Sequence, residues 1–228
     1  MKKQMKSIFA ITLCGILFCS CGAKKKDVTV DDNQKNVQIE IQKTVKRGNG
    51  KVLVAYFTVP ETDGVDASSG ASRVVTDGKI LGNTQYVASV ISKATNGDLF
   101  EIKTVAKYPG SHQAIIDAAK KEQDDNARPQ LTAHVKNMKD YDVVFVGFPN
   151  WWYDMPMPLY SFFDEYDFSG KTVIPFCTHG GSRFSDAVKT IRTLEKHATV
   201  LDGYAVARER VPESEKGILK WLKRIGMN

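Results

Sequence analysis

The 228-residue chain has few cysteines and no long apolar run. Three of its four cysteines stand within the first 21 residues, and the fourth is Cys177. Because Cys177 is the one cysteine after residue 21, we expect no disulfide framework in the folded part. The apolar stretch 8–18 is shorter than the roughly 20 residues that a membrane-spanning helix needs. These shortages exclude a disulfide-stapled domain and argue against a spanning helix.

Sequence motifs for several other chemistries are also missing. Neither a Walker A string nor Gly-x-Gly-x-x-Gly occurs, which argues against ATP and against a tightly bound dinucleotide. His112, His134 and His197 are scattered without the spacing of metal ligands, so we expect no metal site. No internal repeat or low-complexity tract is present, and one domain is the expected organisation of the folded part.

The charge of the chain is concentrated near its start. From residue 51 onward, 22 Lys and Arg residues balance 22 Asp and Glu residues, so the formal net charge of +6 lies before residue 51. A nucleic-acid-binding domain would carry its basic excess on the folded part. We therefore expect no nucleic-acid partner.

The first 21 residues have the three zones of a secretory leader. Lysines among the first six residues precede the apolar stretch, and small residues follow it. The segment Phe18-Cys19-Ser20-Cys21 resembles the lipobox of bacterial lipoproteins, with cleavage before Cys21. This resemblance implies a signal peptide at 1–20, lipidation of Cys21, export, and attachment to a membrane of the bacterial cell envelope. The alternative is a leader that stays uncleaved as a short anchor or interfacial helix.

Residues 21–50 are polar and charged, and we expect them to form a lipidated tether that leads to the folded domain at 51–228. Alternating valines and isoleucines between Val28 and Ile41 allow short edge strands in this segment instead.

From Lys51 onward, short apolar runs alternate with helical patterns, which predicts βαβ units and a parallel sheet. Strands are expected at 51–58, 98–104, 141–148, 171–177 and 199–206. Helices are expected at 84–96, 111–126, 156–166, 183–196 and 212–225. Ser111 is placed to cap the second helix and Pro212 to occupy the first turn of the last. The fold class is α/β, a three-layer, doubly wound, five-stranded parallel sheet.

The stretch 59–81 interrupts this alternation immediately after the first strand. It contains several glycines and serines with only a brief apolar run, so it reads as an insertion in the first strand–helix loop. Asp77-Gly78 predicts a small hairpin within it. Loops of this length inside a compact domain are usually functional or disordered.

Three strands end in turns of unusual composition. The first strand ends at Thr58, and Gly82-Asn83-Thr84 opens the next helix beyond the insertion. The third strand runs into residues 149–153, and the fourth into residues 178–182. Ligands of an open parallel sheet bind outside the carboxyl ends of its strands, so these turns predict one shared pocket.

The three turns suit different parts of one ligand. The helix N-terminus at Gly82, in the first turn, suits phosphate. Trp151 and Trp152, in the second turn, offer flat apolar faces to a planar ring. The glycines at 180 and 181 let backbone groups approach a ligand edge. Each feature also has an ordinary structural reading, as a helix cap, as core packing of a tryptophan, or as a plain turn capped by Ser182 or Ser185.

The chain resembles the flavodoxin family over nearly all of residues 51–226. The resemblance rests on Tyr56-Phe57-Thr58 with Gly82-Asn83-Thr84, on Phe148-Pro149-Asn150-Trp151-Trp152, and on Phe176-Cys177-Thr178-His179-Gly180-Gly181-Ser182. The resemblance implies FMN, held without a covalent bond, and the strand order 2-1-3-4-5. It implies that Thr58, Asn83 and Thr84 hold the phosphate, that the two tryptophans flank the ring, and that 178–182 line its edge. The residues expected to bind the cofactor are Thr58, Gly82, Asn83, Thr84, Pro149, Asn150, Trp151, Trp152, Tyr153, Thr178, His179, Gly180, Gly181 and Ser182.

The resemblance implies electron transfer, or an FMN-dependent oxidoreductase of a small acceptor such as a quinone, with a small-molecule or protein redox partner. No catalytic residue is assigned, although His179 could influence proton movement at the flavin edge. The alternative is a membrane-tethered interaction module that keeps the fold without redox activity, because the insertion splits the phosphate loop after Thr58. A third reading makes Cys177 and His179 a hydrolytic nucleophile and its base.

Overall fold

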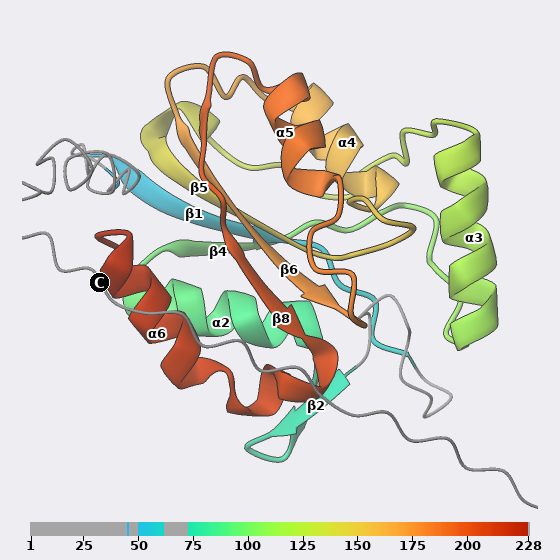
Figure 1. Ribbon diagram of the computed structural model, residues 1–228. Helices are drawn as coiled ribbons and strands as arrows, with labels where there is room; N and C mark the ends of the chain where they lie inside the picture. Colours follow the sequence, from blue (N-terminus) through green and yellow to red (C-terminus); the bar gives the residue numbers. More distant parts are fainter. Residues whose placement is uncertain (1–44, 46–49, 62–72, 228) are drawn as a thin grey trace, which may run out of the picture. The chain divides into compact units, whose positions relative to one another are not determined.

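The computed structural model describes residues 45, 50–61 and 73–227, and Figure 1 shows their arrangement. The expected signal peptide at 1–20, the lipidation site Cys21 and most of the expected tether lie outside the described residues. No helix in the described ranges combines the length and the apolarity that crossing a bilayer requires.

The central sheet is parallel throughout. Its strands are β1 (Lys51–Tyr56), β4 (Asp98–Glu101), β5 (Tyr141–Pro149), β6 (Thr172–His179), β7 (Thr199–Val200) and β8 (Tyr204–Ala207). The order is β4-β1-β5-β6-β7, and β8 also pairs with β6. With β7 and β8 sharing the fifth position, this is the expected order 2-1-3-4-5, which is confirmed.

Helices cover both faces of the sheet, which confirms the three-layer fold (Figure 1). One face packs against α2 (Asn83–Thr95) and α6 (Glu215–Arg224), and the other against α3 (His112–Asp124), α4 (Met157–Glu165) and α5 (Ala187–Leu194). Successive strand residues point to opposite faces. Phe145 accordingly lies in the core on the α2 and α6 side, whereas Val144 and Val146 lie in the core on the other side. Burial on both faces explains the uninterrupted apolar runs in the sequence.

The fifth strand is broken, whereas the sequence predicted one strand at 199–206. β7 ends at Val200, which pairs with Val173 of β6, and β8 begins at Tyr204, which pairs with Phe176. The gap between β7 and β8 therefore lies opposite Ile174 and Pro175. The Leu201 N–H donates to the Val173 carbonyl. Alternate residues of a parallel strand face the same neighbour, so Pro175 also faces the fifth strand and has no N–H to offer it. The missing donor accounts for the break.

Two helix boundaries also differ from expectation. α5 begins at Ala187, because Arg183 and Ser185 adopt positive φ and keep the preceding residues in turns. Pro212 lies in a 3-10 helix, η2 (Arg208–Glu213), and α6 begins only at Glu215. Ser111 is the N-cap residue of α3, as expected, but its side chain makes no capping hydrogen bond in the described part of the chain. A second 3-10 helix, η1 (Met138–Asp140), precedes β5.

The described part of the insertion contains the expected hairpin. It consists of β2 (Arg73–Thr76) and β3 (Lys79–Gly82), which pair in antiparallel register. Asp77 and Gly78 form the turn with φ of 48° and 69°. Positive φ at both positions is the geometry that Asp-Gly favours in a two-residue hairpin. Residues 62–72 of the insertion lie outside the description.

Candidate functional site at three strand ends

The structure brings the three unusual turns together. β1, β5 and β6 are neighbours in the sheet, so their carboxyl ends share one edge. The hydroxyls of Thr84 and Thr178 are hydrogen-bonded at 2.8 Å, which links the first and third turns. The Asn150 N–H donates to the Thr178 carbonyl at 2.9 Å, which links the second turn to the third. This edge is therefore a single candidate site.

The start of α2 forms one end of the site. Gly82 is the N-cap residue of α2, and a Cβ atom added to it would lie 2.1 Å from Thr58 Oγ1. The insertion therefore separates Thr58 from Gly82 in sequence but not in space. The Thr58 hydroxyl is buried and has no hydrogen-bond partner among the described residues. A buried hydroxyl beside the positive end of a helix suits an anion.

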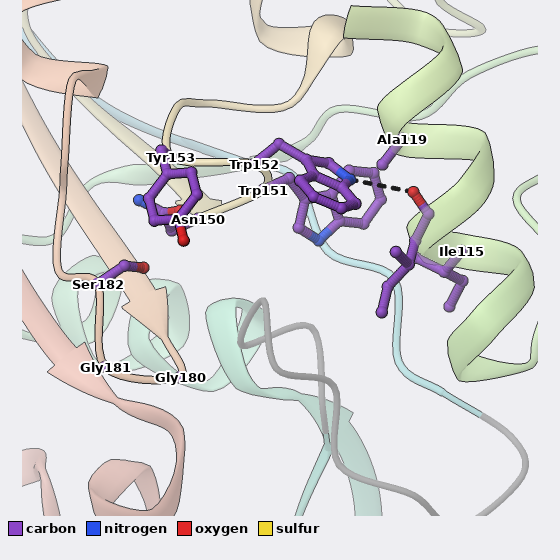
Figure 2. A pocket seen from close by; sticks show the side chains of 10 residues that line it. Ile115, Ala119, Asn150, Trp151, Trp152, Tyr153, Gly180, Gly181 and Ser182 are labelled. Carbon is purple, nitrogen blue, oxygen red and sulfur yellow. Dashed lines mark hydrogen bonds between the residues drawn. The ribbon is translucent and has the colours of Figure 1, made fainter.

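A cavity of about 350 Å³ forms the other end, and Figure 2 shows it between α3 and the third turn. The α3 side is apolar and the third-turn side is mostly glycine backbone. The residues that line it are Ile115, Ile116, Ala119, Asn150, Trp151, Trp152, Tyr153, Gly180, Gly181 and Ser182. A cavity of this size and mixed lining is within the range of small-molecule sites.

The two tryptophans of the second turn occupy different environments. Trp151 is 3% exposed and packs edge-on against Phe57 and Tyr108, at centroid distances of 5.4 and 5.3 Å. Its indole N–H is buried without a hydrogen-bond partner in the part of the chain that the structure describes. Trp152 is 39% exposed, and its indole N–H donates to the Ile116 carbonyl at 3.0 Å, drawn as the dashed line in Figure 2. Trp151 thus belongs to both core and cavity, whereas Trp152 is held against α3.

His179 supports the third turn. It is 6% exposed, and its Nδ1 accepts the Gly181 N–H at 2.9 Å. Nδ1 therefore carries no proton, and the proton of the neutral ring is on Nε2. Burial lowers the pKa of His179; Glu209 opposes this effect and Arg183 adds to it. His179 is consequently neutral at pH 7 and orders its own loop.

Cys177 is unsuited to nucleophilic chemistry. Its side chain is 1% exposed, and its thiol donates to the Arg183 carbonyl at 3.4 Å. Burial raises the pKa of the Cys177 thiol well above its ordinary value, so the thiolate is not available. The geometry argues against the hydrolase reading. The described ranges also contain no cluster of His, Cys, Asp and Glu side chains that could hold a metal ion.

The structure divides the predicted site residues into three groups. Asn150, Trp151, Trp152, Tyr153, Gly180, Gly181 and Ser182 line the cavity, and Thr58, Gly82, Asn83 and Thr84 gather at the start of α2. Pro149, Thr178 and His179 lie in the last residues of β5 and β6. Asn83 and Thr84 are almost fully buried, with 2% and 0% exposure.

Sequence reasoning missed the α3 wall of the cavity. Ile115 and Ala119 read as ordinary core residues of an amphipathic helix, and they are also buried. Their role at the cavity depends on where α3 packs relative to β5, for which the local sequence contains no signal.

Fold and site together define a doubly wound α/β protein with a ligand site at the carboxyl ends of three strands. The chain belongs to the flavodoxin family, since the family model described as flavodoxin matches residues 51–225.

Solved structures agree with this family assignment. The chain is similar to two proteins assigned as flavoproteins, from Bacteroides eggerthii and Bacteroides uniformis, with 26% and 27% identity and TM-scores of 0.58 and 0.55. The matches cover 78% and 76% of this chain and 99% and 98% of those chains. A flavoprotein from Lactobacillus acidophilus, solved in complex with FMN, shares the fold at 18% identity and a TM-score of 0.52, covering 72% of this chain and 97% of that one. No curated protein matches the chain.

The residues present fit FMN. The unpartnered Thr58 hydroxyl and the space kept open by Gly82 offer a place for a phosphate at the start of α2. The unpartnered Trp151 indole N–H and the aromatic and glycine lining of the cavity suit a planar heteroaromatic ring. Polar donors and flat apolar surfaces thus occur at the two ends where FMN has a phosphate and a ring.

Proposed function

We propose that this protein binds FMN and works as a redox protein, either passing electrons to a protein partner or reducing a small acceptor such as a quinone. The observation that carries the proposal is the buried Thr58 hydroxyl, without a partner among the described residues, beside Gly82 at one end of a site whose other end is an aromatic-walled cavity. Polar groups buried without partners are uncommon in folded proteins and need an explanation. A bound phosphate supplies one.

The chain's own residues bind and orient the cofactor. Thr58 and the first N–H groups of α2 hold the phosphate, while the second and third turns hold the ring. FMN, when bound, supplies the redox chemistry, and the surrounding protein tunes its potential. The neutral His179 keeps the third turn ordered through the Gly181 N–H.

The exposed aromatic residues favour a planar, apolar acceptor. Trp152 and Tyr153 line the cavity and remain 39% and 67% exposed. Flat apolar side chains at a cavity support stacking of quinone-like rings. A protein partner could use the same exposed surface.

Cofactor content tests this proposal directly. Full-length protein purified from its host should be yellow, and the apoprotein should quench the fluorescence of added FMN at a stoichiometry near one. Thr58→Val, which removes the hydroxyl and keeps the side-chain volume, should weaken FMN binding while riboflavin binding is unchanged. A colourless protein that leaves FMN emission unquenched would contradict the proposal and favour the interaction module.

We also propose that the protein is exported and held at a bacterial envelope membrane by lipid on Cys21. Support comes from the lipobox-like segment 18–21 and the apolar stretch before it. Cells expressing the full chain and fed labelled palmitate should incorporate label, Cys21→Ser should abolish it, and Cys19→Ser is the matched control. Label retained in Cys21→Ser would contradict the assignment.

A further inference from the structure

A strained two-residue turn carries the exposed aromatic residues of the site. The Trp151 N–H donates to the Asp154 carbonyl at 3.0 Å, and the Asp154 N–H donates to the Trp151 carbonyl at 3.1 Å. Trp152 and Tyr153 therefore occupy its two central positions, with φ of 49° and 66°. Such turns ordinarily take Asn-Gly, because bulky side chains are strained at positive φ. This turn needs contacts from its surroundings to persist.

The side chain of Asp154 provides such contacts on two sides. Its Oδ1 accepts the Met155 N–H at 2.8 Å, and its Oδ2 accepts the hydroxyls of Tyr160 and Thr190, each at 2.9 Å. Tyr160 belongs to α4, which follows the second turn, and Thr190 belongs to α5, which follows the third. One carboxylate therefore joins the aromatic turn to both helices.

The hydroxyl of Tyr160 is a dependable donor to this carboxylate. Burial raises the pKa of Tyr160 to about 12, and the Asp154 carboxylate adds to the effect. Tyr160 therefore stays protonated throughout the physiological range. Hydrogen bonds to a charged acceptor are stronger than those between neutral groups.

Other contacts hold the turn through its carbonyl groups. The Asp186 N–H donates to the Tyr153 carbonyl at 3.0 Å, and the Gln123 amide donates to the Trp152 carbonyl at 3.2 Å. Asp154 differs because it is the closing residue of the turn itself and its side chain reaches beyond the turn. Asp154 itself does not line the cavity.

We propose that Asp154 is a positioning residue whose carboxylate holds Trp152 and Tyr153 in the ring-binding arrangement before the cofactor arrives. The inference rests on the proposed binding of FMN. A turn ordered in advance leaves less conformational entropy for binding to overcome. Without the carboxylate the turn relaxes from positive φ, and the cofactor must reorder it.

The test compares Asp154→Ala and Asp154→Asn with Asp186→Asn in the full chain. Asp186 is the matched control, since it is exposed, its side chain does not cap α5 within the described ranges, and its backbone N–H survives the substitution. The FMN dissociation constant should rise about tenfold to a hundredfold in Asp154→Ala, less in Asp154→Asn, and less than about twofold in the control. The near-ultraviolet circular dichroism of the apoprotein should lose tryptophan signal in the same order.

A double-variant comparison separates positioning from general stability. Tyr153→Gly should raise the melting temperature of the apoprotein, because glycine tolerates positive φ. In the Asp154→Ala background the gain should be smaller, since the turn has already relaxed. An equal gain in both backgrounds, or unchanged FMN affinity and circular dichroism in Asp154→Ala, would overturn the inference.

The outcomes also distinguish this inference from the proposed function. If wild-type protein takes up no FMN, the proposed function fails, while the circular dichroism and melting arms still decide the role of Asp154. If wild-type and Asp154→Ala bind FMN equally, the function stands and the positioning role fails. Should Asp154→Ala not fold, Asp154→Asn provides the same comparison.

Discussion

Gly82→Ala places a methyl group where the Thr58 hydroxyl now lies. The added Cβ would be 2.1 Å from Thr58 Oγ1 and 3.2 Å from both Thr58 Cβ and Cγ2. Gly82 has φ −67° and ψ 148°, which alanine adopts without strain. The consequence of the substitution is therefore steric: the Thr58 side chain must change rotamer and move its hydroxyl away.

The size of the effect follows from what the hydroxyl is proposed to do. A hydrogen bond to a charged group contributes about 1.5–3 kcal/mol, which corresponds to a roughly tenfold to hundredfold rise in the dissociation constant of FMN. Crowding from the two 3.2 Å contacts adds about 1 kcal/mol of lost stability. Gly82→Ala should therefore fold, with a small fall in the free energy of unfolding and a large fall in FMN affinity.

Riboflavin makes the assay specific, because it has the ring of FMN without the phosphate. Fluorescence titration of apoprotein with each ligand should show the loss for FMN alone. Thr58→Ala is the companion variant, since it removes Oγ1 and Cγ2, two of the three Thr58 atoms that the new methyl group meets. In that background Gly82→Ala should weaken FMN little further. Equal losses for riboflavin and FMN, or the same fold-change in both backgrounds, would refute a phosphate site at Thr58.

Three further predictions concern stability. Thr84→Val leaves the buried Thr178 hydroxyl without the Thr84 hydroxyl, and urea denaturation should show a free energy of unfolding lower by about 1–2 kcal/mol. The double variant Thr84→Val with Thr178→Val should lose less than the sum of the two single losses. Burial and two neighbouring carboxylates raise the pKa of Glu195 from 4.5 to about 7, so stability falls as pH rises through that interval, where the unfolded chain loses the proton first. Glu195→Gln should therefore raise the free energy of unfolding by about 1 kcal/mol at pH 8, after discounting for solvent screening, and change it little at pH 4. Burial lowers the pKa of His179, so His179 takes up a proton in the unfolded chain before it does so in the folded protein as pH falls below about 6.5. The free energy of unfolding should therefore decline below that pH, and His179→Asn should flatten the decline.

The sequence sufficed for the parts of the fold that local patterns encode. The apolar runs located the strands of the central sheet, and Asp77-Gly78 located a hairpin whose turn has the geometry that those two residues favour. The break in the fifth strand could not be predicted in this way. It arises from Pro175 on the neighbouring strand, and the register between the two strands is a property of the tertiary structure.

The candidate site divides along the same line. Its turn residues were identifiable because their types are unusual after apolar strands, whereas Asp154 follows the aromatic turn with no feature that marks it. Its importance depends on Tyr160 and Thr190, which only the packing of α4 and α5 brings to it. Likewise, the sequence offered no means to decide which tryptophan would be buried, since Trp151 and Trp152 differ only in the direction that the turn gives them.

The hairpin in the insertion is fastened close to the end of the first strand. The Arg73 guanidinium donates to the Glu61 carbonyl at 3.2 Å, which joins the beginning of β2 to the chain just beyond Thr58. The two flanks of residues 62–72 are therefore in contact, and the length of the segment between them has little influence on the position of β2. Because loop-closure entropy grows only slowly with length, lengthening or shortening the chain between these flanks should change the free energy of folding little.

The register of the hairpin in turn determines the position of Gly82, which is both the last residue of β3 and the N-cap of α2. Val74 is 4% exposed and its strand neighbour Val75 is 69% exposed, so one face of the hairpin is buried and fixes that register. A slip of one residue would turn Val74 to solvent and carry Gly82 away from Thr58. The insertion thus preserves the proposed phosphate end of the site, because its hairpin brings Gly82 to Thr58.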